Sequence, residues 1–128
     1  MKHTLYCVAE AIQVAHHASI LHRNIGADQV LCAQDGRIKL TGFTHAVQLT
    51  TEKNYAHGYK GECKGNRRLL SKYTITPDLR CSPEQANGES YSLPHDIWSF
   101  GVLMCEMANH GRSPFARDLP YSSRSELF

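Results

Sequence analysis

The segment from His95 to Asn109 constrains the fold of this chain more than any other segment, because it is apolar on nearly every face of the helix that it should form. A helix on the surface of a globular protein has one apolar stripe and one polar face. A helix without a polar face is expected to be buried, and the rest of the chain must pack around it. Gly111 follows in a position that suits the end of a helix. The apolar residues are Ile97, Phe100, Val102, Leu103, Met104, Cys105, Met107 and Ala108.

The composition is that of a globular protein with one hydrophobic core. Of the 128 residues, 41% are hydrophobic and 20% are charged, and the net charge is +2, which is enough for one moderate core. Nucleic-acid binding needs a concentrated basic stripe, which this weak positive charge does not supply. We therefore expect no nucleic-acid partner.

Cysteine usage and hydropathy predict a cytoplasmic protein, with the nucleus as a second location. The five cysteines are odd in number and widely spaced, without a Cys-x-x-Cys pair, so we expect neither a disulfide framework nor a zinc site. No signal peptide opens the sequence, and the longest apolar run, Ile97 to Ala108, is too short to span a bilayer. We therefore expect no membrane association. Packing is the expected role of Cys32 and Cys81, with redox sensing as the alternative.

The first third of the chain has the pattern of a helix followed by a β-hairpin. Apolar residues recur at helical spacing from residue 4 to about residue 19. Two β-prone runs, residues 29–33 and 37–40, flank Gln34-Asp35-Gly36, and Asp-Gly favours a tight hairpin turn. This hairpin should bring Asn24 and Gly42 to the same place.

The segment from Thr44 to Arg80 has little periodicity and is expected to be a long loop. Its basic residues outnumber its acidic ones, so it can dock an acidic or phosphorylated partner, or it can simply be solvated. The basic residues that favour docking are Lys53, Lys60, Lys64, Arg67, Arg68 and Lys72, and the segment ends at a further one, Arg80.

A further helix should begin after Ser82. Ser82 can cap it, Pro83 suits its first position, and Gln85 can complete a capping box.

Two motifs in the last third of the chain resemble signatures of the protein-kinase superfamily. Asp96-Ile97-Trp98-Ser99-Phe100-Gly101-Val102 is similar to Asp-x-Trp-Ser-x-Gly-Val, and Gly111-Arg112-Ser113-Pro114-Phe115 is similar to Gly-x-x-Pro-Phe. His22-Arg23-Asn24, Gly42-Phe43-Thr44 and Ser82-Pro83-Glu84 stand where that superfamily has His-Arg-Asp, Asp-Phe-Gly and Ala-Pro-Glu. Within the superfamily, Lys72-Tyr73-Thr74 and the run from Cys105 to Asn109 most resemble the STRAD-type pseudokinase adaptors of the sterile-kinase branch.

The resemblance implies a protein-kinase-like fold that is mainly α with a small β-hairpin, of which this chain is a partial carboxy-terminal lobe. Residues 1–43 would form a helix plus the degenerate catalytic and metal-binding loops, and residues 44–81 an activation-segment-like loop. Residues 82–128 would carry the Ser-Pro-Glu motif, the buried central helix and the following loop. The glycine-rich loop and the nucleotide-anchoring lysine have no counterpart, so we expect a fragment or a truncated form.

The positions that carry kinase chemistry are altered. By the resemblance, Asn24 replaces the aspartate that orients the substrate hydroxyl, and Gln29 and Gly42 replace the asparagine and aspartate that hold magnesium. Gly26 replaces a lysine that neutralises the transferred phosphate, and Thr44 replaces a glycine. Magnesium requires oxygen ligands in near-octahedral geometry, which glycine cannot provide. We therefore expect no catalytic, cofactor-binding or metal-binding residue in this chain.

The resemblance assigns structural roles to other residues. Asp96 should accept hydrogen bonds from the backbone of the His22-Arg23-Asn24 turn, because a buried charge needs such partners. Arg23 can hydrogen-bond to the loop, or it can bind a phosphate on the activation segment. Glu84 normally pairs with an arginine from a later helix that this chain lacks. The structural positions are His22, Arg23, Phe43, Glu84, Asp96 and Trp98, and the possible phosphorylation sites are Ser71, Thr74 and Thr76.

Three histidines, His16, His17 and His22, suggest a metal site, but a solvated helix face is the expected reading. Adjacent residues on a helix point in different directions, and no carboxylate lies at three- or four-residue spacing.

The expected function is that of a pseudokinase, an allosteric adaptor that binds and activates a client serine/threonine kinase. The resemblance implies that client and an armadillo-repeat scaffold as partners. It implies no cofactor for this chain, and ATP only in a full-length form. Two alternatives stay open: an ATP-binding serine/threonine kinase with an atypical active site, and an inert truncated fragment.

Overall fold

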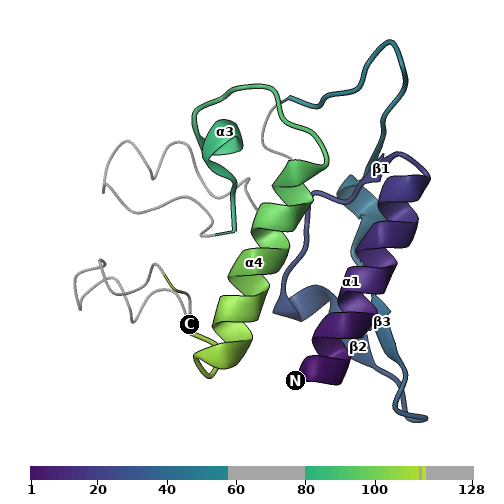
Figure 1. Ribbon diagram of the computed structural model, residues 1–128, viewed down its shortest axis with the longest axis vertical. Coiled ribbons are helices and arrows are strands. Elements are labelled where there is room, and N and C mark those ends of the chain that lie inside the picture. Colours follow the sequence, from purple (N-terminus) through teal and green to yellow (C-terminus); the bar gives the residue numbers. More distant parts are fainter. Residues whose placement is uncertain (58–79, 113, 115–128) are drawn as a thin grey trace.

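The computed structural model describes residues 1–57, 80–112 and 114. In Figure 1, α1 and α4 lie side by side and run in opposite directions, with the β2–β3 hairpin against α1 and α3 beside the start of α4. The helices are α1 (Lys2–His17), α3 (Pro83–Ala86) and α4 (Pro94–Ala108), with 3-10 turns η1 (Ala27–Gln29) and η2 (Phe43–His45). The strands are β1 (Ile20–Leu21), β2 (Val30–Cys32), β3 (Ile38–Leu40) and β4 (Val47–Gln48).

The main hydrophobic core joins α1, α4 and the hairpin. Val8 and Ile12 of α1 are buried against Ile25 and Leu103. These α1 residues recur every third or fourth position, which is the periodicity that predicted the helix, and the prediction is confirmed. The partly buried residues around this core are Val30, Ile38, Leu40, Phe100 and Met107.

The predicted hairpin is also confirmed. β2 and β3 are antiparallel, with Val30 opposite Leu40 and Cys32 opposite Ile38. Gly36 has a φ of +81° in the turn, a conformation that glycine adopts without a steric cost. The turn chemistry read from Asp35-Gly36 therefore sets this register.

A second, smaller core lies where the sequence predicted only a loop. β4 pairs with β1, with Leu21 opposite Val47, and Ala56 forms an isolated bridge with Tyr91. Leu21, Leu49, Ala56 and Tyr91 are buried together. The expectation of a long structureless loop from Thr44 is therefore wrong for residues 44–57, while residues 58–79 lie outside the described part of the chain. Two-residue strands have too little alternation to be seen in a sequence, and only their distant partners make them strands.

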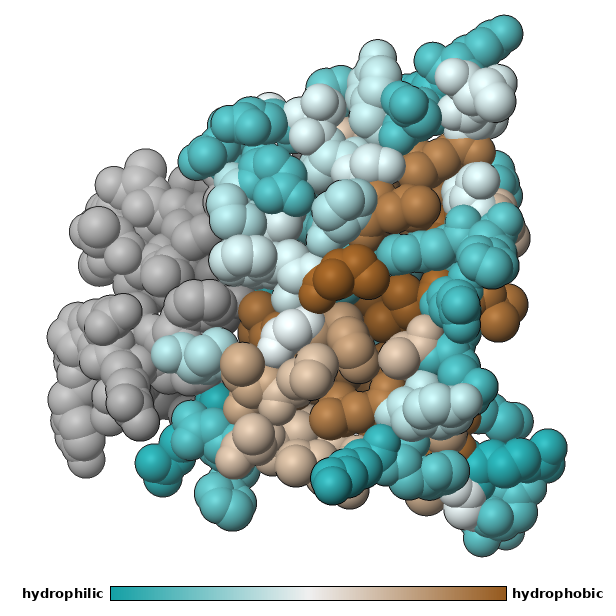
Figure 2. Space-filling model, viewed as in Figure 1, coloured by the Kyte–Doolittle hydropathy of each residue, from teal (hydrophilic) through white to brown (hydrophobic). Residues whose placement is uncertain are grey.

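The expectation that α4 is buried on nearly every face is wrong. His95, Asp96, Ser99, Val102 and Leu103 are buried, but apolar residues on the opposite side are open to solvent. Ile97 is 55% exposed and Met104 is 44% exposed, and Figure 2 shows an apolar surface over the carboxy-terminal half of α4. Within the described residues, α1 and the hairpin pack against one side of α4 only.

The helix after Ser82 begins as predicted, but the capping box is wrong. Pro83 occupies the first turn of α3, yet no side chain caps this helix. Ser82 Oγ instead lies 2.8 Å from His95 Nδ1, and Gln85 Oε1 accepts a hydrogen bond from Cys81 Sγ at 3.0 Å. Ser82, Gln85 and His95 are all buried. The contact between Ser82 and His95 therefore ties the start of α3 to α4, and neither Ser82 nor Gln85 caps the four-residue helix.

α4 ends near Gly111, as predicted. The Gly111 N–H donates to the carbonyl of Glu106 at 2.7 Å, and Gly111 has a φ of +82°. His110 is also left-handed, with a φ of +53°. The helix end thus requires a positive φ at a residue that is not glycine.

In the part of the chain that the structure describes, no helix has the length and apolar content needed to cross a membrane.

Candidate functional site

Asp96, in the first turn of α4, organises the loop that follows β1. It is fully buried, and its carboxylate accepts the backbone N–H groups of His22 at 2.9 Å and of Arg23 at 3.0 Å. These are the hydrogen bonds predicted for it. A buried carboxylate needs such partners to be tolerated, so the conformation of the loop and the burial of Asp96 depend on each other.

His16 completes the partners of Asp96. Its Nε2 lies 2.7 Å from Asp96 Oδ2, which means that this nitrogen carries the proton. The expectation that His16 lies on a solvated face is therefore wrong, although His17 is exposed as expected. The acid that His16 binds is 80 residues away, so no carboxylate at helical spacing marks this pair in the sequence.

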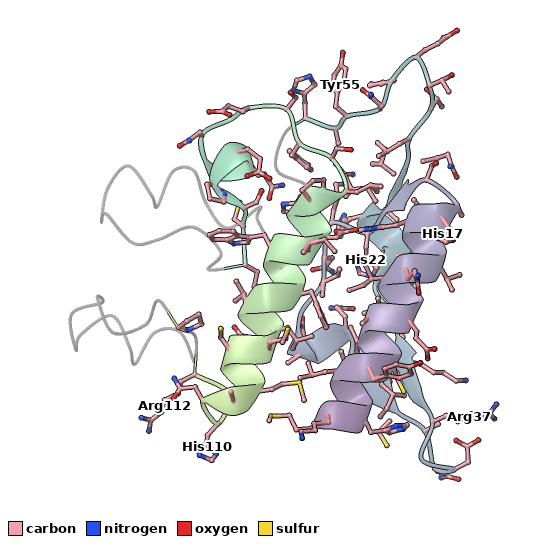
Figure 3. The ribbon with its side chains drawn as sticks, in the orientation of Figure 1. His17, His22, Arg37, Tyr55, His110 and Arg112 are labelled. Atoms are coloured by element: carbon pink, nitrogen blue, oxygen red, sulfur yellow. The ribbon has the colours of Figure 1, made fainter. Side chains whose placement is uncertain are left out.

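His22 is held in one neutral tautomer by two backbone groups. Its Nε2 donates to the carbonyl of Thr41 at 2.8 Å, and its Nδ1 accepts the N–H of Asn24 at 3.1 Å. Burial lowers the pKa of His22, while the Thr41 carbonyl and Asp96 oppose that shift. Figure 3 shows His22 between α1 and α4. The His22 ring therefore joins the loop at Asn24 to the segment at Thr41, next to Gly42.

Arg23 hydrogen-bonds to the segment that follows Gly42. Its Nε donates to the carbonyl of His45 at 2.8 Å, and its Nη1 donates to the Tyr91 hydroxyl at 3.3 Å. The residue is buried and has a φ of +67°. This geometry matches the loop-binding alternative for Arg23. The possible phosphorylation sites Ser71, Thr74 and Thr76 lie outside the described residues.

Gly42 is left no room for a side chain. Its φ is +84°, and a Cβ built on it would collide with Oε1 of Gln29. Gln29 and Gly42 are the two positions at which the resemblance to kinases implies magnesium ligands. The Gln29 side chain therefore occupies the space that a side chain at position 42 would need. A divalent cation needs oxygen ligands, but Gly42 has no side-chain ligand, and Gln29 fills the space where one would lie. The residues present at these two positions do not fit a magnesium–nucleotide complex.

The space beside Gly26 is likewise occupied by another side chain. A Cβ there would collide with the guanidinium of Arg80, and it would lie 2.8 Å from Asp28 Oδ1. Neither Arg80 nor Asp28 was identified from the sequence. A glycine two residues before an aspartate is too weak a signal to reveal an arginine 52 residues beyond that aspartate.

The other predicted structural positions are dispersed. Phe43 stacks edge-on against His22, with ring centroids 4.5 Å apart. Glu84 is half-buried in the first turn of α3, and Trp98 lies on the exposed side of α4. Among the residues with described positions, no group of three or more His, Cys, Asp or Glu side chains could hold a metal ion.

The sequence matches the family described as Protein kinase domain over residues 1–126. Protein kinase C-like 1 of Caenorhabditis elegans is 39% identical over 108 residues, which is 84% of this chain and 13% of that protein. STE20-related kinase adapter protein alpha of Rattus norvegicus is 31% identical over 115 residues, which is 88% of this chain and 27% of that protein. Serine/threonine-protein kinase pakC of Dictyostelium discoideum is 31% identical over 106 residues, 83% of this chain and 19% of that protein. The chain thus spans less than a third of the length of these relatives.

Proposed function

Because this chain belongs to the protein kinase family and has a kinase-like fold, we propose that it is a catalytically impaired member that acts as an allosteric adaptor for a client serine/threonine kinase. We propose further that it is part of a carboxy-terminal lobe, that an armadillo-repeat scaffold is its second partner, and that it works in the cytoplasm, with the nucleus as a second location. ATP would bind only in a full-length form.

The observation that carries this proposal is a loop whose backbone is held by hydrogen bonds with Asp96 and Arg23, although the residues at its expected catalytic and metal-binding positions are altered. Asp96 holds the backbone of His22 and Arg23, and Arg23 holds the carbonyl of His45. In the same loop, Gln29 fills the space beside Gly42. A frame that keeps its shape but has lost the groups for proton and metal chemistry suits binding rather than phosphoryl transfer.

The similarity to an adapter supports the same proposal. STE20-related kinase adapter protein alpha is, by its name, a kinase adapter. The similarity to proteins named as kinases is of the same order, so the altered positions, rather than the degree of identity, favour the adaptor.

An adaptor of this kind acts through differential binding. It shifts a client between inactive and active conformations only by the difference between its affinities for the two. A tenfold shift in that equilibrium requires a difference of about 1.4 kcal/mol, which a small number of surface contacts can supply.

The first experiment measures phosphotransfer. The purified chain is incubated with labelled ATP, magnesium and a generic protein substrate, beside an Asn24→Ala variant. We expect both to incorporate label only at the background rate, since removing a positioned proton acceptor costs about 10²–10⁴ in rate. Incorporation above background that Asn24→Ala abolishes would instead establish an atypical kinase.

The second experiment measures client activation. A panel of purified serine/threonine kinases is assayed with and without the chain, and at least one should be activated in a saturable manner. Tyr55, in the segment after β4, is 41% exposed, and Tyr6, on α1, is 63% exposed. If residues 44–57 belong to the docking surface, Tyr55→Ala weakens the activation and Tyr6→Ala does not. Failure to activate any member of a broad panel, from a folded sample, would favour the inert fragment.

A further inference from the structure

An ion pair links two parts of the chain that lie far apart in the sequence. Arg80 Nη1 donates to Asp28 Oδ1 at 2.8 Å, across 52 residues of sequence. Arg80 Nε also lies 4.0 Å from Glu106 Oε1 on α4. Arg80 is therefore a cation between the loop that carries the altered positions and the central helix.

Gly26 makes room for this cation. Its φ is −168° and its ψ is 170°, an extended conformation that any residue can adopt. The backbone therefore does not require glycine at this position. What excludes a side chain is the guanidinium of Arg80, which lies where a Cβ would be.

The second carboxylate oxygen of Asp28 binds Gln29, the residue that occupies the space beside Gly42. Gln29 Nε2 donates to Asp28 Oδ2 at 3.0 Å, and the opposite end of the same amide, Oε1, fills the space beside Gly42. One carboxylate thus orients both side chains that occupy the space at the two glycines.

Arg80 is also fixed through its backbone. Its carbonyl accepts a hydrogen bond from Ser99 Oγ of α4 at 2.9 Å. The next residue, Cys81, is only 8% exposed and leads into α3. The position of the Arg80 side chain and the burial of Cys81 therefore belong to one packed unit.

We propose that Asp28, Arg80 and Gln29 form an internal clamp that closes the altered site and fastens the start of the Cys81–Ala86 segment to the loop at Gly26. The clamp holds this segment by charges within the chain, and it needs no phosphate bound to Arg23. The inference stands apart from the adaptor proposal, because it concerns how the site is closed and not what binds the molecule.

The test is the modification rate of the Cys81 thiol by iodoacetamide, resolved by peptide mass spectrometry on the folded chain. Asp28→Asn and Arg80→Gln should each raise this rate about fivefold, the change in local opening that a partly exposed ion pair supports. The double variant should show no further increase, because both substitutions remove the same interaction. Arg80→Lys, which keeps the charge, should stay close to the unmodified chain.

Matched controls separate the clamp from general loosening. Asp35→Asn breaks an exposed ion pair with Arg37, at 2.6 Å in the hairpin turn, and should leave the Cys81 rate unchanged. Gly26→Ala should raise that rate by displacing Arg80, whereas Gly101→Ala should not, because a Cβ at Gly101 meets nothing within 4 Å.

Two results would overturn the clamp. One is an unchanged Cys81 rate in both single variants. The other is an additive double variant, which would mean that Asp28 and Arg80 act independently. If Asp28→Asn also raises the modification rate of Cys7, the chain is unfolding as a whole. The test is then the comparison of Gly26→Ala with Gly101→Ala. Equal Cys81 rates in these two variants reject the proposal.

Discussion

At the residue scale, Asp96 is the group on which the loop geometry depends. Its carboxylate binds two backbone N–H groups and the His16 ring, and it has no solvent exposure. Removing one partner of such a buried cluster leaves other polar groups without hydrogen bonds. The free-energy cost of burying these unpaired groups is larger than the net stabilisation that the hydrogen bonds provide.

We expect Asp96→Ala to lower the free energy of unfolding by about 3–5 kcal/mol. The total stability of a small domain is about 5–15 kcal/mol, so this loss is a large fraction of the total. Urea denaturation at pH 7 measures this change. Asp35→Asn, which removes an exposed charge in the hairpin turn, should stay within about 0.5 kcal/mol of the unmodified chain; an equal loss in both variants would contradict the role of Asp96.

His22 predicts a dependence of stability on pH. Burial lowers its pKa below the ordinary value of 6.5, so the unfolded chain binds this proton more tightly than the folded chain does. The contribution of His22 is complete above pH 6.5 and is lost as the pH falls, at a rate of at most about 1.4 kcal/mol per pH unit. The acidic form would also place a proton on Nδ1, which now accepts the N–H of Asn24.

The measurement is the melting temperature between pH 5 and pH 8. His22→Gln should be less stable but should show a shallower pH dependence than the unmodified chain. His17→Gln, at an exposed histidine, should keep the original slope. An unchanged slope in His22→Gln would assign the pH dependence to other groups.

At the element scale, the end of α4 is under strain at one residue. His110 adopts a φ of +53° just before Gly111, and a left-handed conformation costs a residue other than glycine about 1–2 kcal/mol. The Gly111 N–H to Glu106 carbonyl bond requires the chain to reverse here.

We expect His110→Gly to raise the free energy of unfolding by about 0.5–1 kcal/mol, because glycine relieves the strain but gains freedom in the unfolded chain. Gly111→Ala, at a φ of +82°, should lower it by about 1 kcal/mol. Thermal denaturation of the two variants tests this pair, and changes of the same sign would show that the left-handed turn does not limit the stability of α4.

At the scale of the whole molecule, two hydrophobic cores anchor the loop that carries the altered positions. The larger core joins α1, α4 and the hairpin, and the smaller one joins β1, β4 and Tyr91. Ile25 anchors the loop from His22 to Gln29 in the larger core. Leu21, just before this loop, is buried in the smaller core. Local sequence decides α1 and the β2–β3 hairpin, while these two cores decide where the loop is placed.

The open side of α4 predicts self-association of the isolated chain. Ile97 and Met104 are exposed apolar residues on this helix, and contiguous exposed apolar surface favours association. We expect Ile97→Glu combined with Met104→Lys to lower the weight-average mass in analytical ultracentrifugation toward 14.4 kDa. Val14→Glu, at an exposed residue of α1, should have no such effect. If all three samples have the same mass, the α4 surface is not an association site.

The sequence by itself determined the elements whose signal is local. The spacing of apolar residues predicted α1, and Asp35-Gly36 predicted the hairpin, because periodicity and turn chemistry act over a few residues. The motif around Asp96 also predicted its hydrogen bonds to the loop. The apolar pattern of α4, however, wrongly predicted burial on nearly every face, since an apolar helix can be exposed to solvent on one side.

Only the tertiary structure decided the contacts between distant side chains. The pairing of His16 with Asp96 spans 80 residues and that of Arg80 with Asp28 spans 52, and neither leaves a periodic trace in the sequence. The two-residue strands β1 and β4 likewise exist only through each other. Such contacts depend on where packed elements bring side chains within about 3 Å, and that distance is set by the fold as a whole.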